Sequence, residues 1–191
     1  MKKLLLISSL ALSTAIAFSF SSSKKIVVID AGHGGVDHGV SREGILEKDV
    51  VWKIAQKIKN QNPNENLEII FTREGDTYPS LADRTSFINK VKPDLVVSLH
   101  VNSVYSNSDR KGVEVYVQEN EVSRKLGEQL SQKFDNARVA QHNLYILKNS
   151  QAPALLLEVG FMSNADDREY ISSEKGQTEI ANRILDFLVN K

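Results

Sequence analysis

Two histidines and two glutamates, each in a separate short motif, are the residues of this chain best suited to chemistry. They are His33, Glu47, His100 and Glu158. A catalytic zinc takes three protein ligands of nitrogen and oxygen type, keeps one position for water, and works with a further carboxylate that handles the water's proton. Because cysteine is absent, any metal site must use histidine and carboxylate. The four residues therefore supply a complete set for a hydrolytic zinc site.

His33 stands between Asp-Ala-Gly and Gly-Gly, in a glycine-rich loop. This context indicates a tight turn, where a bulky side chain is not expected to serve packing alone. A dinucleotide phosphate loop would need a third glycine at position 37, where Asp37 stands. A Walker-type phosphate loop is excluded as well, because neither Gly-Lys-Ser nor Gly-Lys-Thr follows. Taken alone, His33 can be a metal ligand or a residue of the turn without a chemical role.

His100 and Glu47 also have simpler explanations. His100 ends an apolar run and could be a satisfied core histidine, with Asn102 either orienting its ring or capping the strand. Glu47 could be a solvated glutamate in the first turn of a helix, where the helix dipole favours it. Taken singly, neither residue establishes a site.

Of the four residues, Glu158 gives the strongest individual indication of a functional role. It follows four consecutive apolar or small residues and precedes Val-Gly-Phe. A carboxylate in such surroundings costs several kcal/mol unless it is paired or protonated, so it indicates a partner or a function. Burial is expected to raise its pKa toward the working pH, as a general base requires. His38 and His142 have no comparable context, and we expect both at the surface.

Short β-branched or Leu-rich runs alternate with helical patterns, which is typical of a single α/β domain around a largely buried sheet. Six strands are predicted: Lys25–Asp30, Glu68–Thr72, Asp94–His100, Gly112–Val117, Leu144–Leu147 and Ala154–Glu158. Apolar residues recur at helical spacing in two segments, at Val50, Val51, Ile54 and Ile58 and at Ile180, Ile184 and Leu188. Ser80 and Asp83 predict an N-cap that opens a helix over Leu81–Lys90.

His33, His100 and Glu158 each fall at or just beyond the C-terminal end of a predicted strand. In open α/β sheets this edge is where ligands bind. Glu47 is predicted to begin the helix after the glycine-rich loop, which can fold it back beside His33. The four residues are therefore expected to converge.

Residues 1–17 differ from the rest of the chain. Lys2 and Lys3 precede an apolar and small-residue run that ends in Ala-Ile-Ala. The run is shorter than the ~20 residues that a membrane-spanning helix needs, and a Ser-rich stretch follows. We therefore expect a cleaved signal peptide over 1–17 rather than a membrane anchor, a short polar linker over 18–24, and a catalytic domain over 25–191. The mature protein is expected to be exported, periplasmic or extracellular, without stable membrane insertion, and monomeric.

The whole chain carries 24 basic and 24 acidic residues. Removing Lys2 and Lys3 with the first 17 residues leaves 22 basic residues, a net charge of 22 − 24 = −2. A nucleic-acid partner would leave a clustered positive excess, so none is indicated.

The four motifs together resemble the zinc-dependent N-acetylmuramoyl-L-alanine amidases of the amidase type 3 family, which hydrolyse bacterial cell wall. The resemblance covers nearly all of residues 25–189, and its specificity comes from the order and spacing of the motifs. They are Val28–Gly35, Glu47–Asp49, Thr72–Asp76, Leu81–Arg84, Ser98–Asn102, Gly112–Tyr116 and Pro153–Asn164. One departure is His38, where the family usually has proline, which adds a possible stray ligand.

By this resemblance His33, Glu47 and His100 bind Zn²⁺, and Glu158 is the catalytic acid and base. The implied substrate is peptidoglycan, cleaved at the amide between the lactyl group of N-acetylmuramic acid and L-alanine of the stem peptide. The implied fold is a single α/β domain with a mixed six-stranded sheet flanked by helices.

Some members of this family carry a long insertion with a helix that plugs the zinc site. Here only Gln118 to Val122 separate the predicted strand from the next helical pattern, which is too short for such a helix at ~1.5 Å rise per residue. An open site, active without an activator, is therefore expected. Two other interpretations stay open: a zinc peptidase that cuts within peptides, and a non-catalytic wall-binding or activator protein that kept the fold.

Overall fold

The computed structural model describes residues 24–104 and 109–190, so the predicted signal peptide lies outside the described residues. One six-stranded sheet, with the strand order β4-β1-β5-β8-β6-β7, forms the centre of the domain. Its strands are β1 (Lys25–Ala31), β4 (Leu67–Phe71), β5 (Leu95–Asn102), β6 (Glu114–Val117), β7 (Arg138–Gln141) and β8 (Ala154–Phe161). A small hairpin pairs β2 (Ser41–Arg42) with β3 (Ile45–Leu46).

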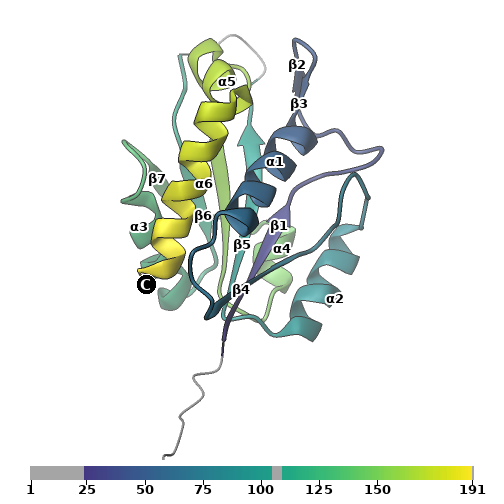
Figure 1. The fold of residues 1–191 in the computed structure, drawn as a ribbon, viewed down its shortest axis with the longest axis vertical. Helices are drawn as coiled ribbons and strands as arrows, with labels where there is room; N and C mark the ends of the chain where they lie inside the picture. The colour runs from purple at the N-terminus through teal and green to yellow at the C-terminus, as the bar shows by residue number, and fades with distance from the viewer. Residues whose placement is uncertain (1–23, 105–108, 191) are drawn as a thin grey trace, which may run out of the picture.

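Helices cover both faces of the sheet. They are α1 (Glu47–Asn60), α2 (Leu81–Val91), α3 (Glu121–Ser131), α4 (Tyr145–Asn149), α5 (Ala165–Ser172) and α6 (Glu174–Val189). Figure 1 shows α1 and α6 side by side across one face, with α2 and α4 on the other side of the sheet. The domain is thus a three-layer α/β structure, as expected from the alternating pattern.

The sheet is mixed. Strands β4, β1, β5 and β8 run parallel, β6 is antiparallel to β8, and β7 is parallel to β6. His100 on β5 is level with Glu158 on β8, and Glu158 is level with Glu114 on β6. The carboxyl ends of the parallel strands therefore meet the start of β6 at a single edge.

Successive side chains along each strand point to opposite faces of the sheet, so the interior consists of two apolar cores, one on each face. Val27, Ile29 and Ala31 of β1 belong to the larger core, which α1, α3 and α6 cover. Val28 belongs to the smaller core with Ile88 of α2 and Ile146 of α4. Because α4 has only five residues, it covers little of this second face.

Most predicted elements are confirmed within one to three residues. Helix α2 begins after Ser80 with the capping box predicted from Asp83. Helix α1 begins at Glu47, as the pattern after the glycine-rich loop predicted. The predicted apolar stripes of α1 and α6 are buried.

The strand predicted at Leu144–Leu147 is wrong. The segment forms the short helix α4, which buries the adjacent residues Ile146 and Leu147 against the sheet. The sixth strand is instead β7, an edge strand that is mostly exposed and pairs with β6 alone. A run of four apolar residues does not distinguish a buried strand from one turn of buried helix.

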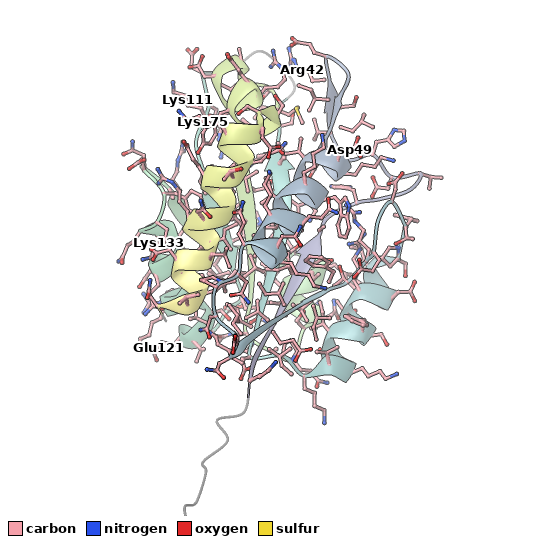
Figure 2. All side chains as sticks on the ribbon, in the orientation of Figure 1. Arg42, Asp49, Lys111, Glu121, Lys133 and Lys175 are labelled. Atoms are coloured by element: carbon pink, nitrogen blue, oxygen red, sulfur yellow. The ribbon has the colours of Figure 1, made fainter. Side chains whose placement is uncertain are left out.

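Charged side chains such as Glu121 and Lys175 are exposed on the outer surfaces of the helices (Figure 2). Over the described part of the chain, none of the helices combines the length and apolar character needed to cross a membrane.

Candidate active site

The turn that carries His33 follows the end of β1 directly. His33 has a positive φ of 59°, which is rare for a residue other than glycine and confirms the predicted tight turn. Its Nδ1 atom lies 2.9 Å from a carboxylate oxygen of Asp37, four residues along the same loop. This contact orients the ring so that Nε2 points away from the loop.

Two glycines of the loop are required by close packing. A Cβ atom on Gly32 would lie only 2.4 Å from the ring of His100. A Cβ atom on Gly39 would lie 2.5 Å from Glu47 and 2.7 Å from His33, and Gly39 also has a φ of 64°. The glycines thus allow the loop backbone to approach all three candidate ligands.

Glu47 is the centre of the cluster. It is 2% exposed, at the first position of α1. Its Oε2 accepts a hydrogen bond of 2.8 Å from the backbone N–H of Val40, and its Oε1 accepts one of 2.9 Å from Val101. Two backbone donors and the positive end of the helix dipole therefore fix and stabilise this carboxylate.

The three candidate ligands meet at this point. His33 Nε2 and His100 Nδ1 each lie 3.0 Å from Glu47 Oε1. The two imidazole rings are edge to face, with centroids 5.0 Å apart. One ligand atom from each of the three residues lies within 4.8 Å of the others. Two imidazoles and one carboxylate form a donor set that suits zinc and leaves room for a fourth ligand.

The charge of the cluster also suits a cation. Burial opposes ionisation of Glu47, but hydrogen bonds from His100 and His33 hold the pKa of this carboxyl well below its usual range. Burial likewise disfavours protonation of His33, yet Glu47 and Asp37 together raise its pKa to about 9. The negative charge that retains this proton would equally attract a metal ion, which binds in competition with the proton.

Glu158 lies beside the three ligands at the end of the apolar part of β8. Its Oε2 atom is buried and has no hydrogen-bond partner among the described residues. Burial raises the pKa of Glu158 to about 7, and the charges of Glu47 and Glu114 add to this effect. A carboxylate without a protein partner, with a pKa near neutrality, can both accept and donate a proton.

Glu114 faces the site from the neighbouring strand β6. It accepts hydrogen bonds of 2.7 Å from the hydroxyl of Tyr116 and 3.0 Å from the amide of Asn102, and it pairs with Arg110 at 2.8 Å. Burial opposes its ionisation, but the hydrogen bonds and charge of these neighbours lower its pKa. The negative charge of Glu114 is thus stabilised by hydrogen bonds and an ion pair, whereas Glu158 Oε2 has no such partner among the described residues.

Two buried arginines hold the His33 turn. Arg84 donates to the carbonyls of Ala31 (2.8 Å) and His33 (2.5 Å) and pairs with buried Asp30 at 2.8 Å. Arg73 donates to the carbonyls of Ala31 (2.9 Å) and Lys48 (2.9 Å), which joins the turn to the start of α1. Sequence reasoning assigned these residues no role, although both stand in motifs that carry the family resemblance.

The structure brings together His33, Glu47 and His100, which were predicted to converge, and places Glu158 on the strand beside His100. His38 and His142 are exposed, as predicted. Asn102 bonds Glu114 and the backbone N–H of Ser103, so it terminates the strand and does not orient His100.

Comparison with known proteins gives consistent matches. A family model described as N-acetylmuramoyl-L-alanine amidase matches residues 27–190. The germination-specific N-acetylmuramoyl-L-alanine amidase of Bacillus subtilis (strain 168) is 28% identical over 188 residues, which cover 87% of this chain and 79% of the relative.

Solved structures agree with these matches. An N-acetylmuramoyl-L-alanine amidase from Clostridium difficile 630 superposes with a TM-score of 0.83 at 29% identity, covering 88% of this chain and 97% of that chain. The CwlD amidase from Clostridioides difficile, solved in complex with the GerS lipoprotein, has a TM-score of 0.80 at 24% identity, covering 87% and 98%. At that identity the second structure demonstrates the shared fold alone.

Proposed function

This chain belongs to the N-acetylmuramoyl-L-alanine amidase family, and we propose that it is a zinc-dependent enzyme that cleaves peptidoglycan between N-acetylmuramic acid and L-alanine. One observation carries this proposal. The buried, unpartnered oxygen of Glu158 lies beside a cluster in which two histidines and a carboxylate converge. This is the arrangement that metal-assisted amide hydrolysis requires.

His33 Nε2, Glu47 Oε1 and His100 Nδ1 would hold the zinc ion, since these are the atoms that converge. When bound, zinc lowers the pKa of a coordinated water toward ~7 and polarises a carbonyl group. Asp37 fixes the tautomer of His33 by accepting a hydrogen bond from Nδ1–H, which leaves Nε2 free to bind.

Glu158 would carry the proton. It takes a proton from the attacking water and returns it to the nitrogen of L-alanine as the amide bond breaks. The products are a lactyl carboxylate on the sugar and a stem peptide with a free amine. A pKa of about 7 suits both steps, because the two protonation states are then similar in free energy near neutral pH.

Substrate access is proposed to be open. Strand β6 ends at Val117 and α3 begins at Glu121, so the connection is three residues, even shorter than the five expected from the sequence. Three residues cannot form a helix that covers the zinc site. We therefore propose that the mature protein acts without an activator, although the CwlD structure contains a lipoprotein partner.

We also propose export to the cell wall, because the substrate lies outside the membrane and residues 1–17 have the pattern of a signal peptide. Fractionation of cells that produce the full chain, with N-terminal sequencing of the protein, tests whether the signal peptide is removed. The secreted or periplasmic protein should begin near Phe18, and a full-length protein retained in the cytoplasm would contradict it.

Product analysis tests the reaction. Residues 18–191 are incubated with purified peptidoglycan, alone and with envelope lipoproteins, and the products are identified by mass spectrometry. We expect intact stem peptides with a free N-terminal L-alanine from the protein alone. Fragments cut within the stem peptide would instead identify a peptidase, and activity that needs a lipoprotein would refute the open site.

A further inference from the structure

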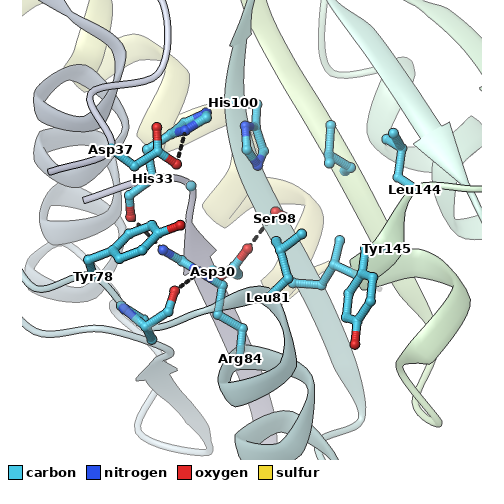
Figure 3. A pocket seen from close by; sticks show the side chains of 14 residues that line it. Asp30, His33, Asp37, Tyr78, Leu81, Arg84, Ser98, His100, Leu144 and Tyr145 are labelled. Atoms are coloured by element: carbon cyan, nitrogen blue, oxygen red, sulfur yellow. Dashed lines mark hydrogen bonds and ion pairs between the residues drawn. The ribbon is translucent and has the colours of Figure 1, made fainter. Parts of the chain in front are cut away.

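A second hollow adjoins the candidate active site on the face of the sheet that α2 and α4 cover only in part. It has a volume of about 290 Å³. Figure 3 shows Tyr78 on one side of it and Leu144 and Tyr145 on the other, with Leu81 and Ser98 between them, and Leu156 also lines it. His33 and His100 line both this hollow and the neighbouring one that contains Glu47 and Glu158. The two hollows therefore meet at the imidazole pair.

The walls of the hollow are held in place by the fold. Ile146 and Leu147 of α4 are 4% and 1% exposed. Gln118 donates to the carbonyls of Leu147 (2.7 Å) and Ser150 (3.0 Å), and Asn89 of α2 donates to Asn149 (2.9 Å). A site whose walls are already ordered loses little entropy when a ligand binds.

The hollow suits an uncharged ligand. Arg84 carries the only permanent positive charge among the described residues that line it, and its buried guanidinium is engaged by Asp30 and three backbone carbonyls. The partly exposed carboxylate of Asp37 would repel an anion. On the far side of Glu158 lie Arg110 and Arg138, beside Glu114. Arg110 pairs with Glu114, but unlike that of Arg84 its side chain is 46% exposed and can be reached by an anion.

This difference in charge distinguishes the two halves of the substrate. A stem peptide carries carboxylates, whereas the N-acetylmuramoyl ring is neutral apart from its lactyl arm. Only three bonds separate ring carbon 3 from the scissile carbonyl carbon, a path of about 4 Å. The ring must therefore lie next to the catalytic groups, as does the hollow that shares His33 and His100 with their site.

We propose that the hollow between Tyr78 and Tyr145 is a saccharide subsite that holds the N-acetylmuramoyl ring, while the stem peptide extends toward Arg110. This inference rests on the proposed amidase function. The tyrosine rings offer flat apolar faces with a polar edge, a combination that suits the apolar face and hydroxyl groups of a sugar. Tyr78, Leu81 and Tyr145 are 53%, 54% and 44% exposed and line one hollow together, so a ligand bound there would cover three of the exposed large apolar side chains.

The test compares two soluble substrates of the zinc-loaded protein. One is the disaccharide N-acetylglucosaminyl-N-acetylmuramoyl tetrapeptide, and the other is the same tetrapeptide carrying only the D-lactyl group. The variants are Tyr145→Ala, Leu81→Ala and Tyr145→Phe. Tyr170→Ala on α5, whose ring is 37% exposed and lies outside the hollow, is the matched control.

We expect Tyr145→Ala and Leu81→Ala to lower the ratio of kcat/KM for the disaccharide substrate to kcat/KM for the lactyl substrate by about tenfold. Tyr145→Phe keeps the ring and should lower the ratio by at most about twofold. Equal losses on both substrates, or no loss on either, would overturn the subsite. The subsite would also be overturned if the wild-type protein cleaved both substrates equally fast, because the saccharide would then contribute nothing to turnover.

Failure of the proposed function has a different outcome. In that case the wild-type protein releases no stem peptide from the disaccharide substrate or from peptidoglycan. Zinc content and circular dichroism of each variant exclude unfolding as the cause of a change in the ratio. A larger loss on the lactyl substrate would place the peptide in the hollow and would also overturn the inference.

Discussion

Replacing Glu158 by glutamine should abolish most activity while making the metal-free protein more stable above neutral pH. The side chain keeps its size, but it can no longer accept a proton. Loss of a general acid and base lowers turnover by ~10²–10⁴-fold. Because His33, Glu47 and His100 remain, the bound zinc should be retained.

The effect on stability follows from the pKa of about 7, compared with an ordinary value of 4.5. At 1.36 kcal/mol per pH unit this difference corresponds to about 3 kcal/mol. Below pH 4.5 the carboxyl group is protonated in both the folded and the unfolded chain, so the wild type has no penalty. Between pH 4.5 and 7 the unfolded state ionises first, and the folded wild type loses relative stability until the full penalty is reached above pH 7.

Glutamine is neutral throughout and has no such dependence. The free energy of unfolding of Glu158→Gln minus that of the wild type should therefore rise by up to about 3 kcal/mol between pH 4.5 and pH 8. This is an upper value, because Glu158 as a whole is only partly buried. The hydrogen bonds of the glutamine amide change the free energy of unfolding by the same amount at both pH values. The part of the difference that varies with pH therefore comes from the buried charge of Glu158.

Urea unfolding with a chelator present measures the stability, and elemental analysis measures zinc in the untreated variant. Glu68→Gln, an exposed glutamate on β4, serves as control and should change neither activity nor the pH profile. A stability difference that does not change with pH would refute the buried carboxylate. Loss of zinc from Glu158→Gln would make Glu158 a ligand and refute its role in proton transfer.

Three further predictions test the site and its support. Exhaustive chelation should remove about one zinc per chain together with all hydrolysis; full activity in a protein shown to lack metal would contradict the metal centre. Asp37→Asn should weaken zinc affinity about 10–100-fold, measured by competition with a chelating dye, because a neutral amide no longer raises the basicity of the His33 ring as the carboxylate does; unchanged affinity would count against that role. Asp30→Asn should cost about 3–5 kcal/mol at pH 7 by leaving Arg84 buried and unpaired. Burial opposes ionisation of Asp30, but Arg84, Ser98 and Thr72 lower its pKa below 3.8. The wild type therefore loses this stability only below about pH 4. Urea unfolding should show the free energies of unfolding of the wild type and of Asp30→Asn approaching each other there, and a difference that stays constant with pH would refute the pairing.

The part of the fold that could be predicted from the sequence is the part with strong apolar periodicity. Strands β1, β5 and β8 are buried on both faces, and their continuous apolar runs identify them. Strand β7 was missed because an exposed edge strand has no such run, and its existence depends on pairing with β6. Helix α4 was mistaken for a strand for the related reason that one turn of helix is too short to show a period.

The supporting residues of the site could not be predicted, because their partners are distant in the chain. Arg84 acts on the backbone of the His33 turn, 51 residues away, and Arg73 acts on Lys48, 25 residues away. An arginine in a helix or loop has the same sequence signature whether it is solvated or buried against carbonyl groups. Only the tertiary structure reveals which of the two applies, since it places both guanidinium groups against backbone carbonyls.

By itself, the sequence determined which residues are candidates for chemistry, two histidines and two glutamates, and their places at strand ends and at a helix start, because these depend on local pattern. The parallel order of β1, β5 and β8 then brings His33, His100 and Glu158 to one edge of the sheet. The tertiary structure alone decided that Glu158 Oε2 is left without a partner while Glu114 is compensated. It also decided that α4 stops short of the site and leaves a hollow beside the histidines. Both outcomes depend on which side chains from distant segments fill a given space, and that is a property of packing and not of local pattern.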